Sequence, residues 1–391
     1  MAEQSGQIRF DKVALVGAMV ALAGAAALPF LELRANRLVP GTAHSVAAAG
    51  PWSYLLWLLV GVGFLSAVAP TEKARAASST ASGYGIVIAL AWGIGHAAVT
   101  LLAGEPPAAR VSLGAGVWVL LAGTAILGFS GSEERRRKVV RWLAPLVLVA
   151  GAVVAAFVWG GLDRISLARE FSVRADSFWT LLGGHLAMSG VGLGFGLLFG
   201  VPLGLWATRN RHVRGVVLGV TGVIQTVPSL ALLGLLIAPL AALSQAVPAL
   251  RALGVRGIGA TPGLIALTLY ALLPIVRNTY VGLAEVDPGV IDAGRGMGMS
   301  SWQLLWRVEF PLALPLIVEG VRTAAVLLIG ITTLTVFAGA RNLGILIFEG
   351  LGQFAPDLIL LGALPIIVLA IVADVALSAL GRALTPEGVR A

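Results

Sequence analysis

Long apolar runs, separated by short polar or basic stretches, constrain this chain more than any other feature of its sequence. A helix rises about 1.5 Å per residue, so about twenty apolar residues cross the hydrocarbon core of a membrane. We count about ten such runs, at approximately 12–31, 52–70, 84–103, 111–130, 139–159, 178–207, 215–241, 261–283, 315–339 and 357–380. Apolar residues make up 58% of the chain and charged residues only 12%, which exceeds what a soluble core of this length needs. We therefore expect an all-α integral membrane protein with about ten transmembrane helices.

Basic residues between the apolar runs predict the orientation of the chain. Short cytoplasmic loops collect arginine and lysine, and EERRRKVVR at 133–141 is strongly basic. Placing this loop inside puts both termini and residues 286–315 in the cytoplasm. The three arginines of residues 160–177 then lie outside, where a helix along the membrane surface would explain them. Basic residues beside membrane spans also explain the net charge of +8, so we expect no nucleic-acid binding.

Several kinds of catalytic and metal site are absent from the sequence. The chain has no cysteine, and its four histidines are scattered, so we expect no metal site. Neither H-E-x-x-H nor G-x-S-x-G occurs, which argues against a membrane-embedded enzyme. The only lysines, Lys12, Lys73 and Lys138, do not follow a glycine, so the G-x-x-x-x-G-K-[ST] motif that binds ATP is missing as well.

Residues 286–315 form a polar, glycine-punctuated interruption between two apolar runs. An acid and two small residues are followed by a glycine, and then by an aliphatic residue and a Phe-Pro pair. The positions are Asp292, Ala293, Gly294, Gly298, Val308 and Pro311. The small residues would allow a partner to approach closely, and Gly298 can end a short helix because glycine tolerates positive φ. The alternative is a solvated loop that only connects two spans.

This spacing resembles the EAA loop of ABC-transporter permeases, a short cytoplasmic helix that docks on the ATPase subunit. Asp292 stands where the family usually has glutamate, Gly294 where it has alanine, and Phe310 where it has leucine. The resemblance implies that the six residues form an ATPase-coupling site. It also implies that ATP is hydrolysed by another chain.

The similarity extends over residues from about 178 to 380. IQTVPSLALLGLL (224–236), LTLYALLPIVRNTYVGLAEVDP (267–288) and GARNLGILIFEG (339–350) resemble the permease subunits of importers for glycine betaine, choline, carnitine and related quaternary amines. This family implies a five-helix core of the type I importer and a bacterial inner-membrane location. The implied partners are cytoplasmic ATPase subunits that carry ATP and Mg²⁺, a periplasmic substrate-binding protein, and a second permease subunit. That second permease is either another copy of this chain or a shorter paralogue, and this chain itself is expected to bind no cofactor.

We expect four parts along the chain. Residues 1–160 form an additional amino-terminal membrane bundle of about five helices, to which the resemblance assigns no function. Residues 161–177 form an external linker or interfacial helix, residues 178–380 the permease core, and residues 381–391 a cytoplasmic tail.

Polar groups and prolines inside the apolar runs are a second candidate site, because such groups are costly within a membrane. The candidate lining of a translocation path or gate is Gln225, Pro228, Tyr270, Arg277, Asn278, Glu319 and Arg322. Glu319 and Arg322 are three residues apart, so they can pair on one face of a helix. Asp374 lies at a similar depth of its span. Structural pairing and a charged inner gate both remain open.

Four glycines recur every fourth residue, at Gly192, Gly196, Gly200 and Gly204. Such a stripe predicts close contact between helices. Packing within the chain and packing at a subunit interface are both compatible with it.

Other functional classes fit the sequence less well. An ABC permease for another small solute remains an alternative. A secondary transporter would need acidic or ion sites near mid-membrane, usually in repeated halves, but the two halves of this chain do not resemble each other and the acids lie near one face.

Overall fold

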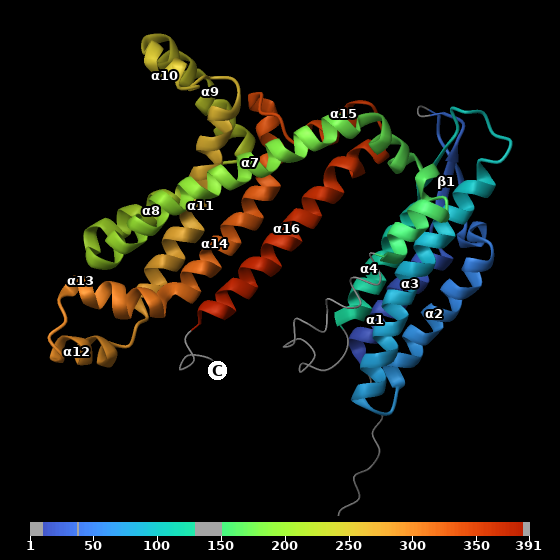
Figure 1. The fold of residues 1–391 in the computed structure, drawn as a ribbon, viewed down its shortest axis with the longest axis horizontal. Helices are drawn as coiled ribbons and strands as arrows, with labels where there is room; N and C mark the ends of the chain where they lie inside the picture. The colour runs from blue at the N-terminus through green and yellow to red at the C-terminus, as the bar shows by residue number, and fades with distance from the viewer. Residues whose placement is uncertain (1–10, 37–38, 130–150, 386–391) are drawn as a thin grey trace, which may run out of the picture. The chain divides into compact units, whose positions relative to one another are not determined.

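The computed structural model describes residues 11–36, 39–129 and 151–385. The chain divides into two compact units, Met1–Val173 (unit 1) and Arg174–Ala391 (unit 2). Most of the described residues are helical (Figure 1), as the long apolar runs predicted.

Helices before residue 130 form much of the described part of unit 1. They are α1 (Lys12–Ala26), α2 (Pro51–Val68), α3 (Glu72–Leu101) and α4 (Ala115–Phe129). Helices α1 and α4 touch backbone to backbone, because a Cβ added at Gly24 would stand 2.6 Å from the amide nitrogen of Leu120. Residues 151–159 are also helical. Small residues on α1, including the fully buried Ala14, Ala18 and Ala21, allow this close approach.

A small antiparallel sheet, which the all-α prediction missed, lies in unit 1. Its order is β2 (Thr42–His44), β1 (Leu31–Arg34), β3 (Arg110–Leu113). The run predicted as a helix over 12–31 ends at Ala26, because Pro29 disfavours a helical conformation in the residue before it. The alternating sequences LELR and RVSL have the period of a strand that is buried on one face.

Residues 161–177, for which a linker or an interfacial helix was predicted, are largely helical. A short 3₁₀ turn (Leu162–Arg164) precedes the long helix α7 (Ser166–Arg209), and residues 162–182 contain no glycine or proline that would break it. Arg169 donates to the carbonyl oxygen of Ala109 at 2.9 Å, and Glu170 pairs with Arg110 at 2.6 Å. These contacts tie the start of α7 to the strand β3.

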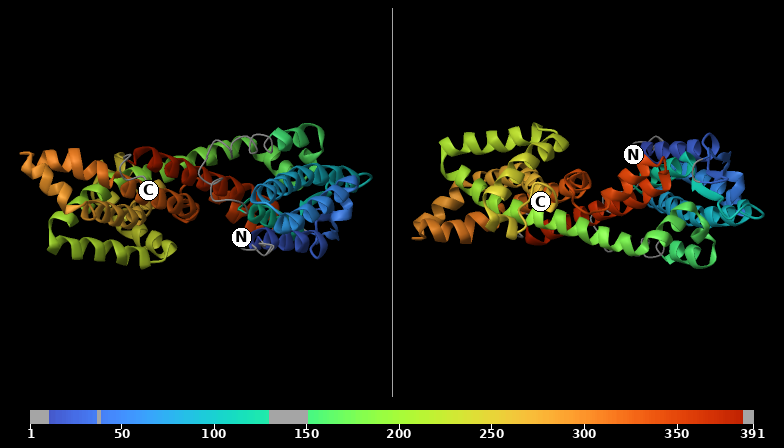
Figure 2. Two further views of the ribbon diagram at one scale, coloured as in Figure 1. Left: turned by 90° about the horizontal axis from the view of Figure 1, so that it is seen from below. Right: turned by 90° about the horizontal axis from the view of Figure 1, so that it is seen from above.

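Unit 2 contains the remaining helices, which Figure 2 shows from below and above. After α7 they are α8 (Arg211–Thr226), α9 (Ser229–Ala246), α10 (Pro248–Ala252), α11 (Ala260–Ala284), α12 (Pro288–Gly296), α13 (Ser301–Leu304), α14 (Phe310–Thr332), α15 (Gly344–Gly352) and α16 (Pro356–Leu384). Helix α14 packs between α11 and α16. Helices α12 and α13 lie at one end of this unit, and α10 and α15 lie at the other (Figure 1).

The glycine stripe of α7 packs within the chain. A Cβ added at Gly196 would stand 2.5 Å from the Cβ of Ala271, and one added at Gly204 would stand 2.6 Å from the Cβ of Thr279. Both neighbours lie on α11, so the stripe brings α7 and α11 into close contact. The interpretation as packing within the chain's own bundle is therefore confirmed.

Seven helices of the described residues are long and apolar enough to cross a membrane. They are α2, α3, α7, α9, α11, the continuous helical segment Ser301–Ala338 and α16. The predicted runs at 12–31 and 111–130 are shorter helices, Lys12–Ala26 and Ala115–Gly128, and most of the run at 139–159 lies outside the described residues. The count of about ten is therefore not confirmed.

The predicted span at 215–241 is divided. Helix α8 ends at Thr226, and α9 begins at Ser229. Pro228 causes the break, because it has no N–H to continue the helix and restricts the residue before it.

Candidate functional site

The short helix α12 has well-defined ends. The Asp287 side chain accepts a hydrogen bond from the backbone N–H of Gly289 at 2.6 Å, and Pro288 occupies the first helical position, where a missing N–H costs nothing. At the other end, the N–H of Met299 donates to the carbonyl oxygen of Gly294 at 3.2 Å, and the N–H of Gly298 donates to the carbonyl oxygen of Arg295 at 2.9 Å. This is a Schellman motif, and Gly298 has φ +82°. The predicted turn at Gly298 is confirmed.

The exposed face of α12 carries charge and small side chains. The side chain of Asp292 is 74% exposed, and it lies 3.5 Å from Arg295, which is 67% exposed. A pair this exposed contributes little to stability, so both charges stay accessible to another molecule. Ala293 beside them is exposed too.

Gly294 was predicted to leave room for a partner protein, but it faces its own chain instead. It is buried, and a Cβ added there would stand 2.7 Å from Cδ1 of Leu304 on α13. The close approach that Gly294 permits is therefore to its own chain. It holds α12 against α13.

The end of the motif forms a widened helical turn. Residues Leu305–Glu309, which include Val308, form a π-helix, and the N–H of Phe310 donates to the carbonyl of Leu305. Pro311 has no N–H for the carbonyl of Arg307, four residues earlier, so one α-helical hydrogen bond is missing where the π turn lies. The chain is helical from Ser301 onward, so the span predicted to begin at 315 begins earlier.

An ion pair with a buried carboxylate and a half-exposed arginine joins this π turn to the end of α7. Arg209 Nη2 contacts Glu309 Oε2, and Nη1 lies 3.4 Å from Oε1. The Glu309 side chain is 4% exposed, whereas that of Arg209 is 49% exposed. Neither residue was among the sites predicted from the sequence. Their only signals were an arginine at the end of an apolar run and an acid inside the motif.

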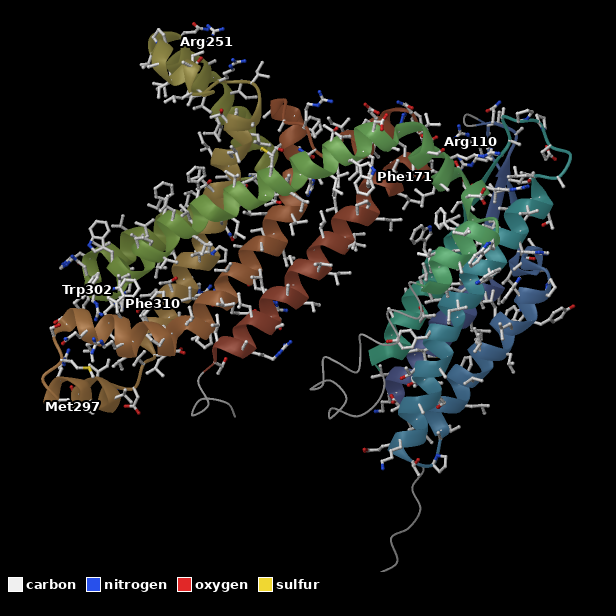
Figure 3. All side chains as sticks on the ribbon, in the orientation of Figure 1. Arg110, Phe171, Arg251, Met297, Trp302 and Phe310 are labelled. Carbon is white, nitrogen blue, oxygen red and sulfur yellow. The ribbon has the colours of Figure 1, made fainter. Side chains whose placement is uncertain are left out.

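Aromatic side chains line the exposed side of the same segment. Trp302 packs edge to face on Trp306 with ring centroids 5.5 Å apart, and Trp306 lies 5.0 Å from Phe310. Trp302 is 67% exposed and Met297 72% exposed. Figure 3 shows Met297, Trp302 and Phe310 at the same end of unit 2. This end presents an apolar surface beside the charges of α12.

Three of the candidate path residues meet at the break between α8 and α9. Tyr270 on α11 donates its hydroxyl hydrogen to the carbonyl of Val227, next to Pro228. Gln225 Nε2, on α8, donates to the backbone carbonyl of Tyr270 at 3.0 Å. That carbonyl has no α-helical donor, because Pro274 stands four residues later and lacks an N–H. The two bonds thus satisfy backbone groups freed by two prolines, as irregular backbone in a membrane requires.

Replacing Gln225 with leucine is expected to lower the free energy of unfolding by about 1–3 kcal/mol, because it leaves the carbonyl of Tyr270 buried without a donor. Thermal unfolding in detergent measures the change. Thr226→Ala is the matched control, since the exposed Thr226 hydroxyl bonds only within α8, to Val223. Equal unfolding midpoints for the two variants would contradict this role of Gln225.

Asn278 and Arg277 lie on different sides of α11. The Asn278 side-chain nitrogen donates to the carbonyl of Pro274 at 2.8 Å, and a Cβ added at Gly320 on α14 would stand 2.7 Å from the Cβ of Asn278. Asn278 thus lies in the contact between α11 and α14. Arg277 is exposed, so the structure does not bring the two together.

The predicted pairing of Glu319 with Arg322 is confirmed. Arg322 Nη1 lies 3.1 Å from both carboxylate oxygens of Glu319, and Nε lies 2.6 Å from Oδ1 of Asp374. The arginine therefore bridges α14 and α16. Each charge has an opposite partner, which lowers the cost of placing them within spans.

Comparisons with known proteins match both units. Residues 11–168 match the family described as the N-terminal domain of the ABC transporter permease YehY, although no resemblance was predicted for this part of the chain. Residues 200–386 match the family described as the inner membrane component of binding-protein-dependent transport systems. The second match includes α12, the π turn and all the candidate path residues.

Individual relatives align with unit 2. The carnitine transport permease protein OpuCB of Listeria monocytogenes is 43% identical over 206 residues, which are 53% of this chain and 87% of the relative. The glycine betaine/carnitine/choline permease OpuCB of Bacillus subtilis is 38% identical over 208 residues (53% and 88%). The osmoprotectant import permease OsmW of Salmonella typhimurium is 41% identical over 206 residues (53% and 91%). This chain therefore belongs to the family of inner-membrane permease subunits of binding-protein-dependent ABC transporters.

Proposed function

We propose that this chain forms the membrane pathway of an ATP-driven importer for glycine betaine, choline, carnitine or a related quaternary amine. The observation that carries the proposal is the 38–43% identity, over nearly the whole length of the relatives, with permeases whose names state these substrates. The resemblance of blocks 224–236, 267–288 and 339–350 to this family supports the same assignment. A permease for another small solute is the alternative.

The coupling site is proposed at α12. Its exposed Asp292 and Ala293, together with the turn at Gly298, would seat in a groove of a cytoplasmic ATPase subunit that carries ATP and Mg²⁺. Gly294 would act indirectly, by holding α12 against Leu304. Val308 and Pro311 would act by shaping the π turn, which passes movement of α12 to α14.

The path is proposed to run along the broken helices. Gln225, Pro228 and Tyr270 would fix the bend between α8 and α9, while Asn278 and the Glu319–Arg322 pair would fix α14 against its neighbours. Arg277, which is exposed on α11, is the candidate for a charge at the pore mouth or a subunit contact. The remaining partners are a periplasmic substrate-binding protein and a second permease, in a bacterial inner membrane with both termini of this chain cytoplasmic.

Uptake by cells that express this chain with the ATPase and binding protein of its own system tests the substrate class. Radiolabelled glycine betaine should accumulate, and excess choline or carnitine should compete with it, whereas excess glycine should not. Glycine matches the carboxylate but lacks the methyl groups. Uptake that glycine suppresses and choline and carnitine do not would assign a different solute.

A further inference from the structure

Unit 1 contains an aromatic pocket that the proposed transport function does not use. Its polar and aromatic lining is Trp52, Trp92, His96, Trp159, Asp163 and Arg164, and its volume is about 510 Å³. That volume falls within the roughly 300–1,000 Å³ of sites that hold small ligands. All these residues lie within unit 1.

The fold brings two indoles together on neighbouring helices. Trp52 stands at the start of α2, and Trp92 lies on α3; their rings stack with centroids 5.7 Å apart and planes 26° apart. Gly93 makes this possible, because a Cβ there would stand 3.2 Å from the Cβ of Trp52. The stacked pair forms a preformed aromatic wall of the aromatic pocket.

The third indole and the two charges come from the segment before α7. Gly161 has φ +82°, a value that favours glycine, and it turns the chain sharply after the helical residues 151–159. Trp159, Asp163 and Arg164, which flank this turn in the chain, all line the aromatic pocket. Trp159 is 77% exposed, so it is not needed for the core of unit 1, and both charged residues are exposed as well.

The chemistry of this lining is selective. A quaternary ammonium group cannot donate a hydrogen bond, and it is held best by the faces of aromatic rings, of which indole is the strongest. Asp163 offers a negative charge to the same group. Arg164 offers the planar donor pair that suits a carboxylate or phosphate. One cation site and one anion site in a single pocket match a molecule that carries both charges.

We propose that the aromatic pocket binds a small zwitterion with a trimethylammonium group, held by Trp52, Trp92, Trp159 and Asp163, and an anionic group, held by Arg164. Two sources share this chemistry: a free solute such as glycine betaine, and the phosphocholine head group of a lipid. Unit 1 alone supplies the lining of the pocket, whereas the candidate path residues all belong to unit 2, so the pocket constitutes a second ligand site of the chain.

Equilibrium binding to the purified full-length chain in a maltoside detergent tests the proposal. The probes for calorimetry are glycine betaine, glycerophosphocholine, tetramethylammonium and glycine. We expect saturable binding of at least one of the two zwitterions, with glycine at least tenfold weaker because it lacks the methyl groups. Tighter binding of glycerophosphocholine would identify the lipid head group as the source, and tighter binding of glycine betaine would identify the free solute.

Variants locate the binding. Trp159→Ala should weaken zwitterion binding about fivefold or more without unfolding the chain, since Trp159 is exposed. Arg164→Gln should weaken binding of the zwitterion but leave tetramethylammonium unchanged. Trp57→Ala is the matched control, because Trp57 lies on α2 outside the pocket lining, and it should bind like the unmodified chain.

The inference would be overturned by zwitterion binding that neither Trp159→Ala nor Arg164→Gln alters, or by the absence of zwitterion binding in the unmodified chain. The choice of glycine betaine as a probe rests on the proposed function, but the choice of tetramethylammonium does not. Loss of tetramethylammonium binding in Trp159→Ala supports the pocket even if uptake of quaternary amines fails. Conversely, normal uptake together with unaltered zwitterion binding in the variants would contradict the proposed binding site but not the proposed transport function.

Discussion

Replacing Gly298 with valine is expected to lower ATP-dependent uptake by roughly five- to 150-fold while the chain still inserts and folds. Gly298 has φ +82°, where a side chain with a Cβ costs about 1–2 kcal/mol, and a β-branched one more. No neighbouring atom lies within 4 Å of a Cβ added there, so the strain falls on the turn rather than on the core. A coupling loss of about 1–3 kcal/mol corresponds to roughly five- to 150-fold. Substrate-stimulated ATPase activity and uptake in vesicles with all subunits measure it.

Two neighbouring variants show whether the effect comes from the turn. Gly296→Ala is the matched control. Gly296 is the last residue of α12, and a Cβ added there also has no neighbouring atom within 4 Å. Unlike Gly298, it is not among the glycines of the described residues that have a positive φ. The Gly296→Ala variant should couple normally. Gly298→Asn should restore much of the activity, since asparagine tolerates the left-handed conformation. Normal coupling in Gly298→Val would leave the segment as a plain connector.

Arg209→Ala is expected to lower the free energy of unfolding by about 2–4 kcal/mol. It leaves the carboxylate of Glu309 buried, at 4% exposure, without its cationic partner, and such a charge is costly. Because the pair ties the end of α7 to the π turn, we also expect the start of α14 to loosen. Chemical or thermal unfolding in detergent measures the first effect, and hydrogen exchange of residues 301–312 measures the second.

A double-substitution cycle separates the pair from its surroundings. Glu309→Gln combined with Arg209→Ala should cost less than the sum of the two single changes, because the unpaired charge is gone. Arg211→Ala, at an exposed arginine two residues further along the chain, is the control and should stay within about 0.5 kcal/mol. Additive costs for the double variant would show that Arg209 and Glu309 act independently.

Features set by local spacing could be predicted from the sequence. The turn at Gly298 and the pairing of Glu319 with Arg322 follow from conformational preference and helical periodicity, which need only a few neighbouring residues. The identity of the long helices follows from the length of their apolar runs. The sheet was missed because the strands are three or four residues long and adjoin apolar helices, which hide their alternation.

Features that join distant segments could not be predicted. Arg209 and Glu309 are 100 residues apart in sequence, and Gly294 has its contact with Leu304 only because the turn at Gly298 folds α13 back. Likewise, the bonds between Gln225, Val227 and Tyr270 depend on how α8 and α11 cross. The aromatic pocket combines residues of α2, α3 and the turn before α7, and nothing in the local sequence of a single tryptophan indicates that three of them line one cavity.

Cross-linking from a single thiol on α12 tests the central claim most directly. The chain has no cysteine, so Ala293→Cys places the only thiol on the exposed face of this helix. Leu253→Cys serves as the comparison, because Leu253 is 81% exposed and directly follows α10, a helix at the other end of unit 2 from α12 (Figure 1). In membranes that contain the whole transporter, a reagent with a maleimide at one end and a photoreactive group at the other should join Ala293→Cys, but not Leu253→Cys, to the ATPase subunit. Cross-linking to the ATPase from Leu253→Cys and none from Ala293→Cys would contradict the assignment of α12 as the coupling helix.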